Sequence, residues 1–487
     1  MTGNATRRRA AVAVLCVVQF MVVLDSTITT VAVDAIRVDL ATDERTLQYV
    51  LSLYAAAFGG LLLLAGRVAD LAGRRRVFVA GAVTFTAASL LCAMASTMPA
   101  LLAGRAVQGA GAAFVSAAAF ALLLDLYPEG PGRNRVLGIW AGLGASGAAA
   151  GLILGGVLTD LAGWHLVFAV NVPLGAAAVA LAVRLLPPAP SARPATARAA
   201  QLDVPGAITA TLGTATLVFA VTRGQAEGWA EPGTVALLAS AAMLLVAFGI
   251  VEARSPDPLV PLPALTRGPL PVAAVAIACL MAVVGSQGFF LVLYLQRIVG
   301  LGPTATGLAI APSALLALVA TTAAARLAGR VPARALVVAG LLLVAVAQLL
   351  LGYLPVDGSY LRDLLPGLLL FGLGLGTAFV GATIAGTAGL APADKGRASG
   401  ILNTAQQVGI AVGVAVLVSA AAVESARPEV LASGYGTGLR LGAFVAVAGA
   451  VFAAAGGRTR FGSTGRPARA GVGIVAGDGE SAVADRQ

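Results

Sequence analysis

Two residues of opposite charge lie deep within apolar stretches of the sequence. Asp25 is the only charged residue in the run 10–33, and Arg105 is the only one in the run 99–124. A charge at the centre of a membrane helix costs roughly 2.5–3.5 kcal/mol on insertion scales, so each is a candidate functional group by default. The two side chains can pair if their helices are neighbours; otherwise each must face a polar cavity of its own.

The chemistry open to this pair is the binding and release of a proton. Desolvation favours the neutral form of a carboxyl group, whereas a nearby guanidinium favours the ionised form. Movement of Arg105, or entry of water, would therefore change the proton affinity of Asp25. Gln108 lies on the same helical face as Arg105 and can join the pair. Asp34, at the outer end of the first run, is a second acid that could receive protons or substrate, although a solvated position at the membrane surface is the simpler interpretation.

Five further amide side chains fall within apolar stretches. Each of them can line a cavity or form hydrogen bonds between helices. These cavity candidates are Gln19, Gln287, Asn403, Gln406 and Gln407.

A second group of polar residues lies in a short connection after the second apolar stretch. Asp70 and Arg74 are four residues apart, so they can pair on one helical turn. Gly66 and Gly73 permit a tight turn, and Asp125 can join the network from the end of another stretch. A simple basic anchor at the membrane surface is the alternative. The group comprises Gly66, Asp70, Gly73, Arg74, Arg75 and Asp125.

The elements that must position these residues are membrane helices. The 487 residues are 59% hydrophobic and 11% charged, whereas a soluble chain is about 25% charged. We count fourteen stretches near the roughly 20 apolar residues that cross a bilayer. The first lacks a convincing cleavage site, so we read it as an uncleaved span. The sequence therefore predicts an all-α polytopic membrane protein.

The basic residues predict the orientation of these helices. Most of the 32 Lys and Arg residues fall in every second connection, beginning with Arg7–Arg9 and continuing with Arg74–Arg76. Such alternation marks cytoplasmic loops. We therefore predict a multi-pass protein of the bacterial plasma membrane with both termini in the cytoplasm. The net charge of +10 is explained in this way, and no nucleic-acid partner is expected.

Composition argues against several other kinds of site. The chain has one histidine, and its three cysteines lie in apolar runs, so no metal site or cofactor is expected. A Gly-x-x-x-x-Gly-Lys-Ser/Thr loop is absent from the sequence, which argues against transport driven by ATP. No catalytic cluster is visible, so a membrane enzyme or sensor is disfavoured.

Two weak internal matches suggest a duplicated chain. The segment 65–76 resembles 324–335, and the segment at 135–139 resembles that at 397–401, at nearly the same offset. Two parallel halves indicate a secondary transporter with its site between them. The predicted division is an N-terminal six-helix half (1–186), a cytoplasmic linker (187–203), an inserted helix pair (204–254), a C-terminal six-helix half (255–457) and a disordered cytoplasmic tail (458–487).

Several motifs resemble those of the major facilitator superfamily. The segment from Gly66 to Arg75 resembles its signature between helices two and three, Gly-x-Leu-Ala-Asp-Arg-x-Gly-Arg-Lys, with Leu71 in place of the usual Arg. The segment 102–113, with Arg105 and Gln108, resembles the fourth-helix motif associated with proton transfer. Segments 164–175 and 396–409 resemble the family's helices six and thirteen.

Two further motifs are only partly kept. The fifth-helix antiporter motif is similar to the set Gly147, Gly151, Gly155 and Gly156, but Leu152 stands where Pro is usual. The segment 24–32 resembles the first-helix motif of the fourteen-helix drug:proton antiporter family, with Thr30 in place of the usual Asn.

This resemblance implies a fold of two six-helix halves with two extra central helices. It further implies proton-coupled efflux of small amphipathic drugs or antibiotics by a protein that functions as a monomer. Asp25 would bind the proton, Arg105 would tune its release, and the loop at Asp70 would act as a gate. The alternative is a proton-coupled importer or metabolite exporter on the same fold, which the departure at Leu152 keeps open.

Overall fold

The protein is all-helical in the parts that the computed structural model describes. The predicted linker, except for Asp203, and the tail beyond residue 460 lie outside those parts. The described residues are 2–127, 131–186, 203–255, 268–328, 330–388, 390, 392–421 and 427–460.

The described residues of the N-terminal part form nine helices, and a helical hairpin follows them. The nine are α1 (Thr2–Val31), α2 (Val33–Asp39), α3 (Glu44–Leu47), α4 (Tyr49–Ala72), α5 (Arg74–Ala93), α6 (Met98–Leu126), α7 (Pro131–Ala162), α8 (His165–Ala169) and α9 (Asn171–Leu185). The hairpin consists of α11 (Val204–Glu227) and α12 (Pro232–Arg254).

The described residues of the C-terminal part form six α-helices and two π-helical turns. They are α14 (Leu270–Leu293), η1 (Tyr294–Ile298), α15 (Pro303–Leu327), α16 (Ala333–Leu351), η2 (Tyr360–Leu364), α17 (Leu365–Thr387), α18 (Pro392–Ala421) and α19 (Pro428–Arg460). Proline stands in the first turn of α6, α11, α12, α14, α15 and α17, where its missing N–H is not needed.

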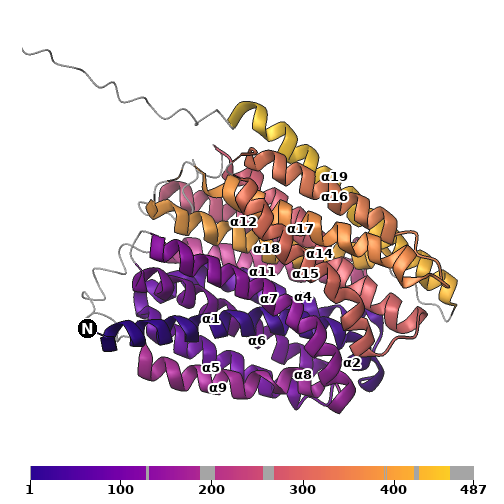
Figure 1. Ribbon diagram of the computed structural model, residues 1–487, viewed down its shortest axis with the longest axis horizontal. Coiled ribbons are helices and arrows are strands. Elements are labelled where there is room, and N and C mark those ends of the chain that lie inside the picture. Colours follow the sequence, from indigo (N-terminus) through magenta and orange to yellow (C-terminus); the bar gives the residue numbers. More distant parts are fainter. Residues whose placement is uncertain are drawn as a thin grey trace, which may run out of the picture.

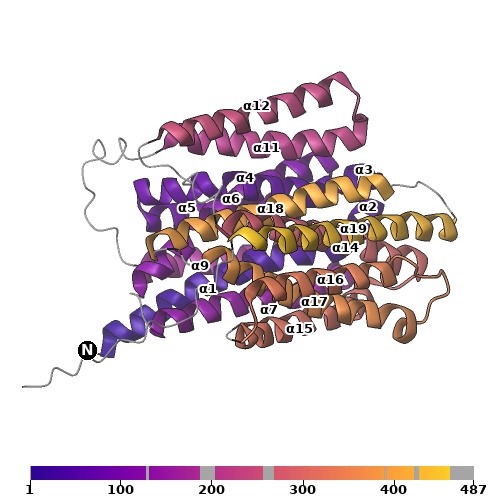
Figure 2. The same ribbon diagram turned by 90° about the horizontal axis from the view of Figure 1, so that it is seen from above.

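The long helices run nearly along one axis and form two bundles (Figure 1). One bundle holds α1–α9 and the other α14–α19, while the α11–α12 hairpin lies outside both, beside α4 (Figure 2). We call the end of the molecule that carries the α4–α5 turn the Gly73 end. The opposite end, with the α7–α8 turn, is the Trp164 end.

The largest apolar cluster that the two bundles share lies towards the Trp164 end, and a smaller one joins Ala55 and Ala56 of α4 to Ala411 of α18. In the largest cluster, Leu24 and Ile28 of α1 lie with Phe289 of α14 and Val418 of α18. The large clusters towards the Gly73 end each belong to a single bundle of the described chain, one with α1, α4–α6 and α9, the other with α14 and α16–α19. The bundles are therefore joined most firmly at the Trp164 end.

Close backbone contacts strengthen this junction. A side chain on Gly307 of α15 would collide with the carbonyl oxygen of Leu152 on α7, and one on Gly156 would collide with that of Pro303. The carboxylate of Asp160 on α7 also accepts a hydrogen bond from the backbone N–H of Thr304, 2.9 Å away at the start of α15. A carboxylate at a helix N-terminus is favourable because it offsets the helix dipole.

Eleven helices of the described residues are long and apolar enough to cross a membrane. The two parts of α4, which meet at an angle of 50°, would together make a twelfth. Two shorter apolar stretches, Ala150–Ala162 and Pro205–Val221, belong to α7 and α11. The chain is thus a multi-pass membrane protein, with eleven or twelve candidate spans among the described residues, and the predicted count of fourteen stays a prediction.

The packing at Gly307 leads to a test of the junction. We expect Gly307→Ala to lower the apparent Tm of the purified protein by several degrees, because overpacking a tight contact costs about 1–3 kcal/mol. Gly249→Ala is the matched control, since a Cβ at Gly249 would meet no atom within 4 Å. Equal melting temperatures for the two variants would show that the α7–α15 contact is loose.

Candidate functional site

The structure places Asp25 and Arg105 in direct contact. Arg105 Nη1 donates to Asp25 Oδ2 across 2.7 Å, and the two side chains are 1% and 0% exposed. Asp25 comes from α1 and Arg105 from α6, which are neighbours in the N-terminal bundle. The sequence left open whether the two charges pair or each face a polar cavity, and in the structure they pair.

The second oxygen of the Asp25 carboxylate is also occupied. Oδ1 accepts hydrogen bonds from Gln108 Nε2 and from Asn171 Nδ2, each across 2.7 Å. Gln108 Nε2 also donates to Ser89 Oγ at 2.8 Å. All of these side chains are buried. The carboxylate therefore accepts three hydrogen bonds without contact with solvent.

Arg105 is held by the backbone and by aromatic rings as well. Its Nε donates to the carbonyl of Val50 at 2.9 Å, and its Nη1 also donates to Gln108 Oε1 at 2.7 Å. The guanidinium carbon lies 4.1 Å from the ring centroid of Tyr54 and 5.6 Å from that of Phe168. Each such contact contributes about 0.5–2 kcal/mol, with the larger values at desolvated sites.

We call Asp25, Ser89, Arg105, Gln108 and Asn171 the Asp25 cluster. Its members come from four different helices, α1, α5, α6 and α9. Loss of one partner of a buried ion pair costs about 3–5 kcal/mol, because it leaves a charge uncompensated. The cluster is thus closed to solvent, with both charges paired, and it can exchange a proton only if its helices move or water enters.

Three members of this environment escaped the sequence analysis. Asn171 lies in the segment 164–175, where its amide inside an apolar stretch was the available signal. Ser89 and Tyr54 carried no signal, because single serines and tyrosines are common in membrane helices. Asn171 Oδ1 has no hydrogen-bond partner within the described residues, so it is a spare acceptor beside the carboxylate.

The predicted glycine motif forms a packing face on α7. Gly147, Gly151 and Gly155 lie against the backbone or side chains of Phe20, Thr27 and Ile28, on the helix that carries Asp25. The fourth glycine, Gly156, faces α15 of the other bundle. The motif therefore lets α7 contact both the Asp25 helix and the second bundle.

The predicted loop residues form an ion-pair network at the Gly73 end. Arg74 Nη2 lies 2.8 Å from Asp70 Oδ1, and Arg74 also pairs with Asp125. Gly73 has a φ of +96°, a conformation that favours glycine. Arg75 donates to the carbonyl of Val183. The network ties α4, α5 and α6 together within one bundle.

Gly66 and Asp34 stand apart from these contacts. A Cβ at Gly66 would meet no atom within 4 Å, so close packing does not require glycine there. Asp34, in the short helix α2, forms an ion pair with Arg37 at 2.8 Å. No hydrogen bond links it to the Asp25 cluster within the described chain.

The five cavity candidates are spread over both bundles. Gln287 and Gln407 are buried, and the Cβ of Gln407 lies close to Gly59 on α4. Gln19 and Gln406 are half-buried, whereas Asn403 is exposed. None of them hydrogen-bonds to the Asp25 cluster in the part of the chain described.

Comparison with known proteins identifies relatives over most of the chain. The model of the Major Facilitator Superfamily matches residues 15–414. A puromycin resistance protein of Streptomyces alboniger is 39% identical, over 85% of this chain and 82% of that protein. A cephamycin export protein of Amycolatopsis lactamdurans is 37% identical, over 92% and 91%. A crystal structure of a peptide transporter in complex with sulfate shares the fold, with a TM-score of 0.66 and 18% identity over 92% of this chain and 95% of that one.

Arg105 is buried and Arg74 is partly exposed, and this difference leads to a prediction for a pair of variants. We expect Arg105→Ala to destabilise the protein by about 3–5 kcal/mol, because Asp25 loses its buried partner. Arg74→Ala removes the same side chain from a half-exposed pair and should cost no more than about 1 kcal/mol. Thermal unfolding of both variants in one detergent checks this, and similar losses would contradict the closed character of the Asp25 cluster.

Proposed function

The chain belongs to the Major Facilitator Superfamily, and on that premise we propose that it exports small amphipathic drugs or antibiotics across the plasma membrane in exchange for protons. As a member of this family it is a membrane transporter and not an enzyme. Support for export comes from relatives that are named for antibiotic resistance and for antibiotic export. Support for proton coupling comes from one observation, the buried Asp25–Arg105 pair.

The proposed architecture has fourteen spans. Two six-helix halves, 1–186 and 255–457, would rock against each other, and the α11–α12 hairpin of the segment 204–254 would accompany the first half through its contact with α4. The position of the basic residues supports a cytoplasmic Gly73 end. Because the bundles share their core at the opposite end, the described state would be closed towards the outside.

In the proposed cycle, Asp25 is the residue that binds and releases the proton. In the closed cluster its carboxylate is matched by Arg105, Gln108 and Asn171. Movement of α1 against α6 would separate the carboxylate from Arg105 and favour its protonation. Proton and substrate would each shift the equilibrium between the two states by their different affinities for them.

The loop network would act at the other end of the same cycle. Arg74, Asp70 and Asp125 hold α4, α5 and α6 as one unit. We infer that this unit latches the Gly73 end when that end closes. One chain would suffice for transport, because both halves that form the pathway belong to it.

The proposal is tested with Asp25→Asn in inverted membrane vesicles. We expect pH-gradient-driven transport of a fluorescent cation such as ethidium to fall to background, because an amide cannot exchange the proton. Asp357→Asn is the matched control, since Asp357 lies exposed in a connection at the Trp164 end. Undiminished coupled transport by Asp25→Asn would remove Asp25 from the mechanism.

A further inference from the structure

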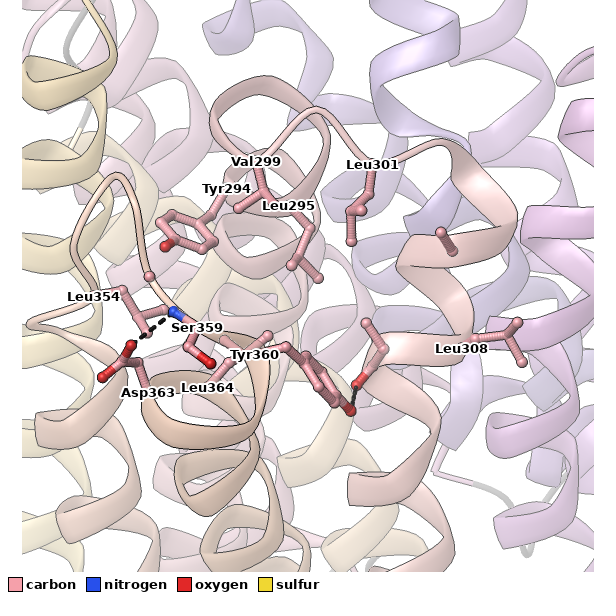
Figure 3. Close-up of a pocket in the computed structure, with 13 residues that line it drawn as sticks. Tyr294, Leu295, Val299, Leu301, Leu308, Leu354, Ser359, Tyr360, Asp363 and Leu364 are labelled. Atoms are coloured by element: carbon pink, nitrogen blue, oxygen red, sulfur yellow. Dashed lines mark hydrogen bonds between the residues drawn. The ribbon is translucent and has the colours of Figure 1, made fainter.

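A cavity lies in the C-terminal bundle, away from the Asp25 cluster. It has a volume of about 450 Å³, within the roughly 300–1,000 Å³ typical of small-molecule sites. It lies at the Trp164 end, between η1, the first turns of α15, the connection after α16 and η2 (Figure 3). Most of its surface is aliphatic, with Leu295, Leu301 and Leu308 among the lining residues.

Both π-helical turns of the described chain border this cavity, and each begins with a tyrosine that lines it. Tyr294, the first residue of η1, donates its hydroxyl hydrogen to the carbonyl of Pro355 at 2.6 Å. Tyr360, the first residue of η2, donates to the carbonyl of Ala309 at 2.9 Å. Single π-helical turns are rare and often occur at functional sites.

The polar atoms that remain for a ligand are mainly acceptors. The two tyrosine hydroxyls have used their hydrogens, so each offers only oxygen lone pairs. Asp363 accepts the backbone N–H of Ser359 at 2.7 Å through Oδ2, and its carboxylate can accept more. Asp363 is the one charged residue among the described lining residues. The nearby Arg297 donates to Tyr435 of α19, 3.1 Å away, and does not line the cavity.

We propose that this cavity binds a small amphipathic cation. The leucine side chains would cover its apolar body, and the Asp363 carboxylate would face its positive charge. The rings of Tyr294 and Tyr360 add cation–π attraction. This site belongs to the second bundle alone, so it does not share residues with the Asp25 cluster and does not depend on the proposed proton exchange.

The test measures protection of a cysteine placed in the cavity. Leu308 is 53% exposed, so Leu308→Cys gives a thiol that N-ethylmaleimide can reach. Val38→Cys, 65% exposed on α2 at the same end, is the control outside the cavity. The probe is tetraphenylphosphonium, and tetraphenylborate supplies the same shape with the opposite charge. The parent chain, in which Cys16 and Cys92 are buried, gives the background of labelling.

We expect tetraphenylphosphonium, but not tetraphenylborate, to slow labelling of Leu308→Cys and to leave Val38→Cys unchanged. Adding Asp363→Asn should weaken this protection about tenfold, the size of one charge-assisted contact. Asn can still accept the Ser359 N–H, so the variant removes mainly the charge. Asp357→Asn removes a nearby exposed charge that does not line the cavity and should leave protection intact.

Three results would overturn the proposal. They are equal labelling with and without tetraphenylphosphonium, equal protection by the two ions, and undiminished protection after Asp363→Asn. Because the assay measures binding and not transport, its outcome is independent of whether the protein exports drugs.

Discussion

The burial of a charge pair in the N-terminal bundle is the constraint on which the rest of the structure depends. The side chains of Asp25 and Arg105 are buried away from water. A buried ion pair is stable only when further hydrogen bonds satisfy the remaining donors and acceptors of the two charged groups. The partners come from α4, α5 and α9 in addition to α1 and α6. Five helices are therefore held in register by the need to satisfy one ion pair.

Small residues make this convergence possible. A side chain on Gly109 of α6 would collide with the carbonyl of Tyr54, so glycine lets α6 approach α4 closely enough for Val50 and Tyr54 to reach Arg105. On the other side, the glycines of α7 let this helix pack closely against both the Asp25 helix and α15 of the second bundle. Helix association in lipid has no hydrophobic driving force, so it depends on van der Waals packing and interhelical hydrogen bonds, both of which close approach of the backbones favours.

The sequence identified Asp25 and Arg105 as candidates because charges are rare in its apolar stretches, but it left open whether the two side chains pair. It did not identify Asn171, Ser89 or Tyr54 as partners, because the contacts of such common polar residues depend on which helices pack around them, and the sequence does not give this packing. Asp34 is also an aspartate close to the first apolar stretch, yet in the structure it pairs locally with Arg37. The helical, multi-pass character followed from composition, and the described residues contain eleven helices that could cross a membrane, or twelve with the bent α4, while the predicted number of fourteen stays a prediction.

The contact between Asp160 and the first turn of α15 joins the two bundles by charge and dipole. Asp160 is exposed, so dissolved ions can reach it, and at physiological salt such interactions fade over about 8 Å. Its contribution, about 0.3–1 kcal/mol at low ionic strength, is comparable with thermal energy. The stability of the contact between the two bundles at this end therefore depends partly on the ionic strength of the surrounding solution, and it decreases as the salt concentration rises.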